Sequence, residues 1–284
     1  MLSVIIPALN SASTISRTLS SIFSNKFSED LFEVLMIDNG STDNTVEIAK
    51  KYDVTVYRCE PRGIGPPRNL GIRKAKGDIV CFTDSDCIVD NCWLQKFHDF
   101  FERNPEVDGV GGPTFPYPVS QNRLQELTGE LFVDEHNYPK SITKLQHRRK
   151  GPLLFGSNSA YKKEALLDVG GFPEPGGSCW ELSWKLLAAQ HSLVFNPEIT
   201  VFHIFPSTFK SVYRMYFRWG FQFSSMQKRY RGESEAINGI FFSGYNIAKL
   251  WLSLCSLKVD AKKILRLNQA VTYFVGRLSG LTDA

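Results

Sequence analysis

The sequence predicts an α/β domain with a mostly parallel central sheet, followed by a helical extension. Through the first 86 residues, short runs of β-forming residues alternate with helical segments. This alternation is typical of parallel strands joined by right-handed crossover helices. Each run also stops at a polar or conformationally special residue, as strands do where an open α/β sheet binds a ligand. We place the domain at residues 1–205 and the helical extension at residues 206–284.

The first four predicted strands lie at 4–6, 34–37, 54–57 and 80–82. The helix between the first two strands is predicted from apolar residues that recur with helical spacing. These residues are Ile15, Leu19, Ile22 and Phe23.

Two further helices separate the later strands. One is predicted to begin after residues 39–42, with Ser41 or Thr42 as its cap, and to run to about Lys51. The other covers residues 68–74. It follows a Gly-rich turn that ends in proline, a residue that suits the first position of a helix.

Beyond residue 86 the pattern changes, and the elements become less regular. We predict a helix at 91–103, a Gly/Pro-rich strand region at 107–118, a helix-like stretch at 121–135, a loop with a short strand at 153–159, a helix from 161, a helix at 180–189 and a strand at 193–203. The rest of the chain is helical and rich in aromatic residues and cations.

Composition excludes several classes of protein. A length of 284 residues with 43% hydrophobic residues supports a large core. A net charge of +4, with both signs interspersed, gives no indication of a nucleic-acid partner. No apolar run reaches the roughly 18 residues of a membrane span. The cysteines lack metal-type spacing and no secretory signal precedes them, so we expect reduced thiols in the cytoplasm.

The most informative motif is Asp84-Ser85-Asp86, at the end of the fourth strand. Two carboxylates separated by one residue can direct one side chain toward a sugar and the other toward a divalent cation, which prefers oxygen ligands. We assign Asp86 as a metal ligand and Asp84 as a contact to ribose or to metal-bound water. Alone, the tripeptide is equally compatible with an Asp-rich turn, but the neighbouring strand ends favour a site.

Those neighbouring strand ends also carry polar groups. Asp38 ends the second strand, and its carboxylate can accept a hydrogen bond from a nucleobase while Gly40 allows a ligand to approach. A simple helix-capping turn is the alternative. Arg68 and Asn69 follow the Gly-rich turn and can reach a base or diphosphate, since a guanidinium fork matches such acceptors.

Taken in order, these motifs resemble the family-2 glycosyltransferases. The matching stretches are 3–10, 33–45, 63–71, 77–86, 156–160 and 170–172. The resemblance implies a Rossmann-like nucleotide-sugar-binding domain of the A-type glycosyltransferase fold, a nucleotide-sugar donor, and Mn²⁺ or Mg²⁺ as cofactor. It also implies that Pro7, Ala8, Asp38 and Arg68 line the nucleoside pocket and that Asp84, Ser85 and Asp86 form the metal-bearing motif.

The chain departs from the family pattern at two positions. Asn39 stands where the family usually has a second acid, although an amide can still bond a base. Cys179 falls where the family has the aspartate that deprotonates the acceptor, and a neutral thiol is a poor base for an alcohol. We therefore predict Glu181 as the catalytic base, with a solvated or supporting helix residue as the alternative and Glu174 as a weaker candidate.

His203 follows a predicted strand and resembles a histidine that many family members carry there. We predict that it binds the metal or touches a phosphate. A packed core histidine is the alternative.

The helical extension is predicted either to lie on a membrane surface or to pack against protein, on the catalytic domain or in a dimer contact. Aromatic residues and cations alternate between Tyr213 and Tyr230. A second apolar stripe includes Leu250, Trp251 and Leu254 and is followed by Lys258, Lys262, Lys263 and Arg266. An apolar stripe beside cations is typical of a helix in a membrane interface.

We therefore expect a metal-dependent, inverting glycosyltransferase that takes a nucleotide sugar, most simply a UDP-sugar. Its acceptor would be a hydroxyl of a glycan or polyprenyl-linked acceptor in cell-surface polysaccharide synthesis, reached from the cytoplasmic side of the membrane. The alternatives are a silent nucleotide-sugar-binding or scaffold subunit and a sugar nucleotidyltransferase. The sequence does not identify the oligomeric state.

Overall fold

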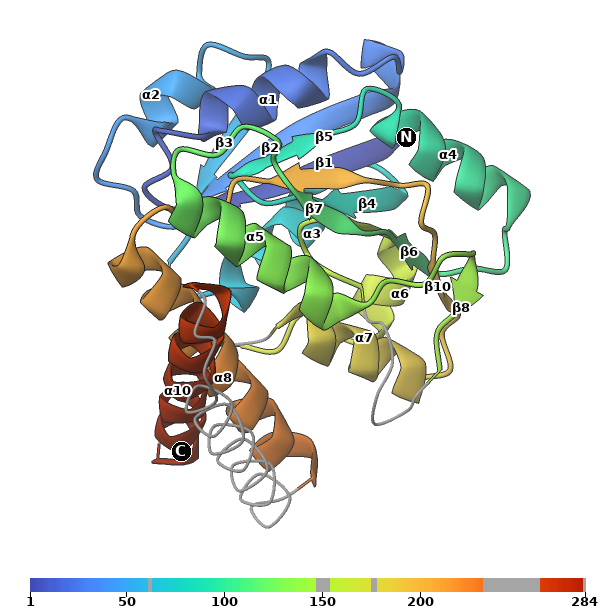
Figure 1. The fold of residues 1–284 in the computed structure, drawn as a ribbon. Coiled ribbons are helices and arrows are strands. Elements are labelled where there is room, and N and C mark those ends of the chain that lie inside the picture. The colour runs from blue at the N-terminus through green and yellow to red at the C-terminus, as the bar shows by residue number, and fades with distance from the viewer. Residues whose placement is uncertain (61–62, 147–153, 175–177, 232–260, 283–284) are drawn as a thin grey trace. The chain divides into compact units, whose positions relative to one another are not determined.

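The structure is a computed structural model that describes residues 1–60, 63–146, 154–174, 178–231 and 261–282 (Figure 1). It divides into two compact units. The first comprises residues 1–118 and 136–204, and the second comprises residues 119–135 and 205–284. The extent of the catalytic domain, at residues 1–205, stays a prediction.

Within the described residues of the first unit, eight strands form a mixed sheet in the order β3-β2-β1-β4-β9-β6-β10-β8. The strands are β1 (Leu2–Ala8), β2 (Phe32–Asp38), β3 (Thr55–Arg58), β4 (Ile79–Phe82), β6 (Gly109–Gly111), β8 (Thr143–Lys144), β9 (Ser159–Lys162) and β10 (Leu193–Phe195). β9 runs antiparallel to β4 and β6, and β8 runs antiparallel to β10, while the other pairs are parallel. The prediction of a mostly parallel sheet is confirmed.

Helices cover both faces of this sheet because its strands are apolar on both sides. On the face that holds Val4 and Ile6 lie α1 (Ile15–Phe23), α2 (Thr45–Ala49) and α4 (Trp93–Arg103). On the face that holds Ile5 lie α3 (Gly65–Lys74), α6 (Lys163–Asp168) and α7 (Cys179–Ala188). Figure 1 shows α1 and α2 across the sheet from α6 and α7. A short 3-10 helix, η1 (Glu29–Leu31), precedes β2.

A second, three-stranded sheet has the order β5-β11-β7, with β5 (Cys87–Val89), β7 (Thr114–Pro116) and β11 (Val201–His203). The prediction of one strand over 193–203 is wrong, because the chain divides there into β10 and β11, which belong to different sheets. Pro197 lacks the N–H that a ladder needs, and the backbone N–H of Glu198 bonds the Asn196 side chain at 3.0 Å. The residues between the two strands therefore form a turn.

The predicted cap of α2 is also wrong. The helix begins at Thr45, and the Asp43 carboxylate accepts from the Thr45 N–H at 3.1 Å. The N–H groups of Ser41 and Thr42 bond Asp38 and Asn10 instead, at 3.0 and 2.8 Å. This part of the chain is thus fixed to the ends of β1 and β2.

The short strand expected within 153–159 lies later, as β9, and the helix that follows it is α6. Here the turn residues Gly156 to Asn158 precede the strand. The strand region at 107–118 forms β6 and β7.

Asn158 connects three segments beneath the second sheet. Its side chain is fully buried. Its Oδ1 accepts from the Trp93 indole N–H at 2.9 Å, and its Nδ2 donates to the carbonyls of Pro113 and Ile199 at 2.9 and 2.7 Å. The amide thereby joins α4 to the residues that lead into β7 and β11.

We expect Asn158→Ala to destabilise the protein by about 4 kcal/mol, because each buried group left without a partner costs roughly 1–3 kcal/mol. Denaturant unfolding measures the change. Asn104→Ala is the matched control, since its amide makes a single bond, to the Phe100 carbonyl, in a partly buried place. Equal losses in the two variants would contradict the role assigned to Asn158.

The second unit contains most of α5 (Arg123–His136), together with α8 (Phe209–Arg231) and α10 (Ala261–Thr282). α8 and α10 approach closely at Gly220, where a Cβ atom would collide with the Tyr273 carbonyl. No helix within the described residues is long and apolar enough to cross a bilayer.

Two cations for which the sequence analysis left membrane binding and ordinary packing open have protein partners. Lys262 lies 3.2 Å from Glu130 and 3.0 Å from Asp134, and Arg266 lies 2.9 Å from Asp134. They therefore connect α10 to α5. The apolar stripe around Leu250 and Trp251 lies outside the described residues.

Candidate functional site: a carboxylate-rich sheet edge

The carboxyl ends of β1 and β2 bring three of the predicted nucleoside-pocket residues together. Ala8 pairs with Asp38 in the parallel register, and Pro7 is the residue before it. The Asn39 N–H donates to the Ala8 carbonyl at 2.8 Å, and the Asp38 carboxylate accepts from the Ser41 N–H at 3.0 Å. Asp38 is 4% exposed, and the oxygen that accepts from Ser41 orients the loop that follows β2.

Asn39 uses its side chain in a way that an acid could not. Its Nδ2 donates to the Gly63 carbonyl at 2.7 Å and ties the loop after β2 to the turn before α3. Its Oδ1 is buried and has no hydrogen-bond partner in the described part of the chain. A buried acceptor without a partner is costly. An N–H donor on a bound base would satisfy it.

Asp84 and Arg68 form a close ion pair. The Arg68 Nη2 donates to Asp84 Oδ1 at 2.6 Å, while its Nη1 donates to the Ile64 carbonyl at 3.1 Å. The Arg68 side chain is 8% exposed and that of Asp84 is 33% exposed. A ligand in this place would therefore meet Asp84 first, and Arg68 holds that carboxylate from below.

Ser85 is held by a residue that the sequence analysis did not identify. Its hydroxyl lies 2.7 Å from that of Ser11, which follows β1. The Ser11 N–H donates to Thr45 at 2.7 Å. Asn10, beside it, has a φ of 52°, a left-handed conformation that asparagine tolerates better than most residues. The loop after β1 thus fixes the centre of the Asp-Ser-Asp turn.

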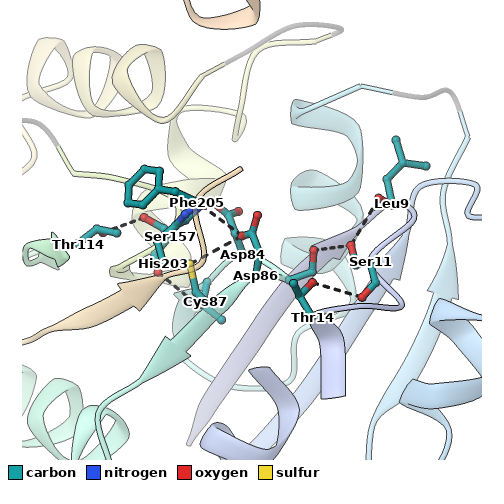
Figure 2. A network of polar contacts seen from close by, with 12 residues as sticks. Leu9, Ser11, Thr14, Asp84, Asp86, Cys87, Thr114, Ser157, His203 and Phe205 are labelled. Atoms are coloured by element: carbon teal, nitrogen blue, oxygen red, sulfur yellow. Dashed lines mark hydrogen bonds and ion pairs between the residues drawn. The ribbon is translucent and has the colours of Figure 1, made fainter. Parts of the chain in front are cut away.

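Asp86 and His203 are brought together by the second sheet. Asp86 Oδ1 lies 3.3 Å from His203 Nε2, and the Ile204 N–H donates to the Asp86 carbonyl at 2.9 Å. Because β11 pairs with β5 in antiparallel register, His203 stands opposite Cys87, the residue after Asp86. The three side chains offer ligand atoms within 4.8 Å of one another (Figure 2).

This donor set fits a divalent cation. A carboxylate oxygen and an imidazole nitrogen are ligands that Mn²⁺ accepts. Cys87 is fully buried, and burial together with the Asp86 carboxylate raises the pKa of its thiol well above the ordinary value. A hard cation such as Mn²⁺ also prefers oxygen and imidazole ligands to sulfur, so Asp86 and His203 remain the predicted metal ligands.

Cys179 lies beside the Arg68–Asp84 pair. A Cβ atom at Gly156 would collide with its Sγ and would approach Arg68 Nη2 to 3.2 Å. Burial raises the pKa of the Cys179 thiol, and Arg68 opposes this only in part. At neutral pH the thiol keeps its proton.

The two candidate bases lie on different segments. Glu181 is 2% exposed in the first turn of α7, where its N–H donates to the Ser178 hydroxyl at 3.3 Å. Residues two apart on a helix do not share a face, so Glu181 and Cys179 point to different sides of α7.

Glu174 lies in the loop before α7. It is exposed, and its carboxylate accepts from Asn69 Nδ2 at 2.8 Å. Asn69 also bonds both backbone groups of Phe172 at 2.8 Å, so it fixes this loop to α3 next to Arg68. The predicted contact of Asn69 with a ligand is replaced by this role as a clamp.

Comparison with known proteins identifies the family. A family model described as Glycosyl transferase family 2 matches residues 3–170. Glycosyltransferase AglE of Haloferax volcanii is 29% identical over 216 residues, which are 71% of this chain and 66% of AglE. TarS of Staphylococcus aureus, a poly(ribitol-phosphate) beta-N-acetylglucosaminyltransferase, is 31% identical over 176 residues, which are 58% of this chain and 30% of TarS. The chain thus spans only part of the length of each of these relatives.

Solved structures support the fold. The mannosyltransferase PcManGT of Pyrobaculum calidifontis has a TM-score of 0.70 at 17% identity, over 99% of this chain and 87% of its own. The structure of residues 1–349 of S. aureus TarS has a TM-score of 0.58 at 20% identity, over 97% of this chain and 80% of the TarS chain. The predicted A-type glycosyltransferase fold is confirmed. Because the family match covers more than half of the sequence and includes the Asp-Ser-Asp turn, the chain belongs to glycosyltransferase family 2.

Proposed function

We propose that the protein is a metal-dependent, inverting glycosyltransferase that transfers a sugar from a nucleotide sugar to a hydroxyl of a glycan or lipid-linked acceptor in cell-surface polysaccharide synthesis. The observation that carries this proposal is the approach of His203 Nε2 to Asp86 Oδ1, at 3.3 Å, within the turn whose first acid pairs with Arg68. That arrangement supports a cation site next to the half-buried Asp84 carboxylate, at the end of the sheet where we propose that the nucleoside binds.

The donor is proposed to lie along this edge. Its base would reach Asp38 and the unsatisfied Asn39 Oδ1, and its ribose would reach Asp84. Mn²⁺ or Mg²⁺ held by Asp86 and His203 would neutralise the diphosphate as it departs. PcManGT was solved with GDP-Man and Mn²⁺ and TarS with UDP-GlcNAc. TarS is the relative with the higher sequence identity, so we favour a UDP-sugar.

The acceptor is proposed to be a glycan or a polyprenyl-linked sugar. Among the relatives, a glucosyl-dolichyl phosphate glucuronosyltransferase of H. volcanii is 28% identical over 166 residues, 55% of this chain and 50% of that protein. TarS and the staphylococcal poly-beta-1,6-N-acetyl-D-glucosamine synthase are both named for polymers. Action from the cytoplasmic face of a membrane remains a prediction.

For the proton transfer we propose Glu181 as the base, although this residue is 2% exposed and points to a different side of α7 from Cys179. The exposed Glu174 is the alternative. A single displacement inverts the anomeric carbon. In that step a carboxylate aligns and deprotonates the attacking hydroxyl of the acceptor. Cys179 favours one competing function, a nucleotide-sugar-binding subunit that does not catalyse transfer, because a protonated thiol stands beside Asp84.

A donor screen tests the proposed function. Full-length protein with Mn²⁺ is incubated with UDP- and GDP-sugars, with and without membrane extract, and nucleotide diphosphate release is measured. We expect release from one UDP-sugar, stimulation by the extract, and loss of release on chelation of the metal. Nucleotide binding without release from any donor would instead support the silent subunit.

A further inference from the structure

Helix α8 presents two parallel rows of side chains outside its packed face. Val212, Met215 and Tyr216 are buried. Phe209 and Tyr213 are 68% and 46% exposed, and Phe217, four residues further on, is half-buried. The rings of Tyr213 and Phe217 stack at 6.1 Å. These three residues form the aromatic row.

The second row consists of Lys210, Arg214 and Arg218, all of them exposed. Each follows a member of the aromatic row by one residue, which is a rotation of about 100° on a helix. The cationic row therefore runs beside the aromatic row, on the side away from the packed face. Within the described part of the chain, no ion pair is formed by any of these three cations.

The positive charge of α8 is also not balanced along the sequence. No acidic residue occurs between Glu198 and Glu233. α10 differs, since its Lys262 and Arg266 are paired with acids of α5. The cationic row is thus available to bind an anionic partner.

We propose that the two rows of α8 bind the surface of an anionic lipid bilayer. Aromatic rings and cations side by side on one helix match the boundary between acyl chains and headgroups, where rings insert and cations meet lipid phosphates. Another polyanion would satisfy the cations but would leave Phe209 in water. The proposal rests on the proposed function and deepens it, because the bilayer is where a lipid-linked acceptor resides. Binding to the bilayer can be measured without any sugar substrate.

The test is co-sedimentation of the full-length protein with vesicles of phosphatidylcholine containing phosphatidylglycerol. We expect binding that weakens with added salt and falls sharply on vesicles of phosphatidylcholine alone. Each cation near an anionic surface strengthens partitioning onto the vesicles about fivefold. The triple variant Lys210→Gln, Arg214→Gln and Arg218→Gln should therefore weaken partitioning about a hundredfold. Phe209→Ser with Tyr213→Ser should also weaken it, with less change in the salt dependence.

The matched control removes the same charge elsewhere, through Arg17→Gln, Lys26→Gln and Lys50→Gln, which are exposed positions of the first unit. This control should keep full binding. Equal weakening in control and row variants, or no vesicle binding by the native protein, would overturn the proposal. So would a loss of self-association in the row variants on size-exclusion chromatography, which would assign the rows to a second copy of the chain. Mn²⁺-dependent UDP binding should persist in the row variants, so a failure here is distinct from a failure of the proposed function.

Discussion

Replacing Asp86 by alanine is expected to weaken Mn²⁺-dependent UDP binding about a hundredfold, to the value measured without metal. Asp86 and His203, 3.3 Å apart, are the groups that we propose as ligands of the cation. Without the carboxylate, the charge of the diphosphate stays uncompensated, and a bound divalent cation is worth several kcal/mol to such charge. Calorimetric titration of UDP with and without Mn²⁺ measures the effect.

His203→Ala should weaken the same binding in the same direction, and Asp78→Ala is the control. Asp78 precedes β4, the strand that leads into the Asp-Ser-Asp turn, and its side chain is 95% exposed. Its removal deletes one acidic charge without touching the turn. If the native protein binds UDP equally well with and without Mn²⁺, the assignment of Asp86 and His203 as metal ligands is wrong.

The parts of the fold that could be predicted from sequence are those fixed by local patterns. The runs before Pro7, Asp38 and Asp84 are apolar on both faces and stop at a proline or an acid, so β1, β2 and β4 were evident. The pairing of β1 with β2 continues through Pro7 and Asp38. The turn at Asn196 and Pro197 was missed because an apolar run before it and another after it read as one strand. The antiparallel insertion of β9 between β4 and β6 depends on pairings between residues 48 or more positions apart, which no local pattern encodes.

The site divides in the same way. The Asp-Ser-Asp turn and Asp38 stand at strand ends, so their common location follows from parallel pairing alone. Ser11 was not identified, because its role depends on a contact with Ser85 in a separate segment. Asn39 carried a signal, since an amide at a position usually acidic indicates a group that must donate, and the Gly63 carbonyl is its acceptor.

The identity of the base gives the second large effect. Glu181→Gln is expected to reduce sugar transfer by about 10²–10⁴, since a positioned carboxylate contributes on that order when the acceptor is a weakly acidic hydroxyl. Affinity for UDP and Mn²⁺ should stay native, because the change removes a proton acceptor and leaves the Asp-Ser-Asp turn intact. Single-turnover transfer with the donor found in the screen measures the rate, and calorimetry measures the affinity.

Two matched variants assign the role. Glu174→Gln keeps a hydrogen-bond acceptor for Asn69 and tests the alternative carboxylate. Cys179→Ser should be mild, because burial raises the pKa of the thiol and it is protonated at neutral pH, so it cannot accept the proton. A native rate in Glu181→Gln together with an inactive Glu174→Gln would move the base to the loop clamped by Asn69. If Cys179→Ser alone were inactive, with its nucleotide affinity intact, the thiol beside Asp84 would be acting as a thiolate in the bound state, and neither carboxylate would be the base.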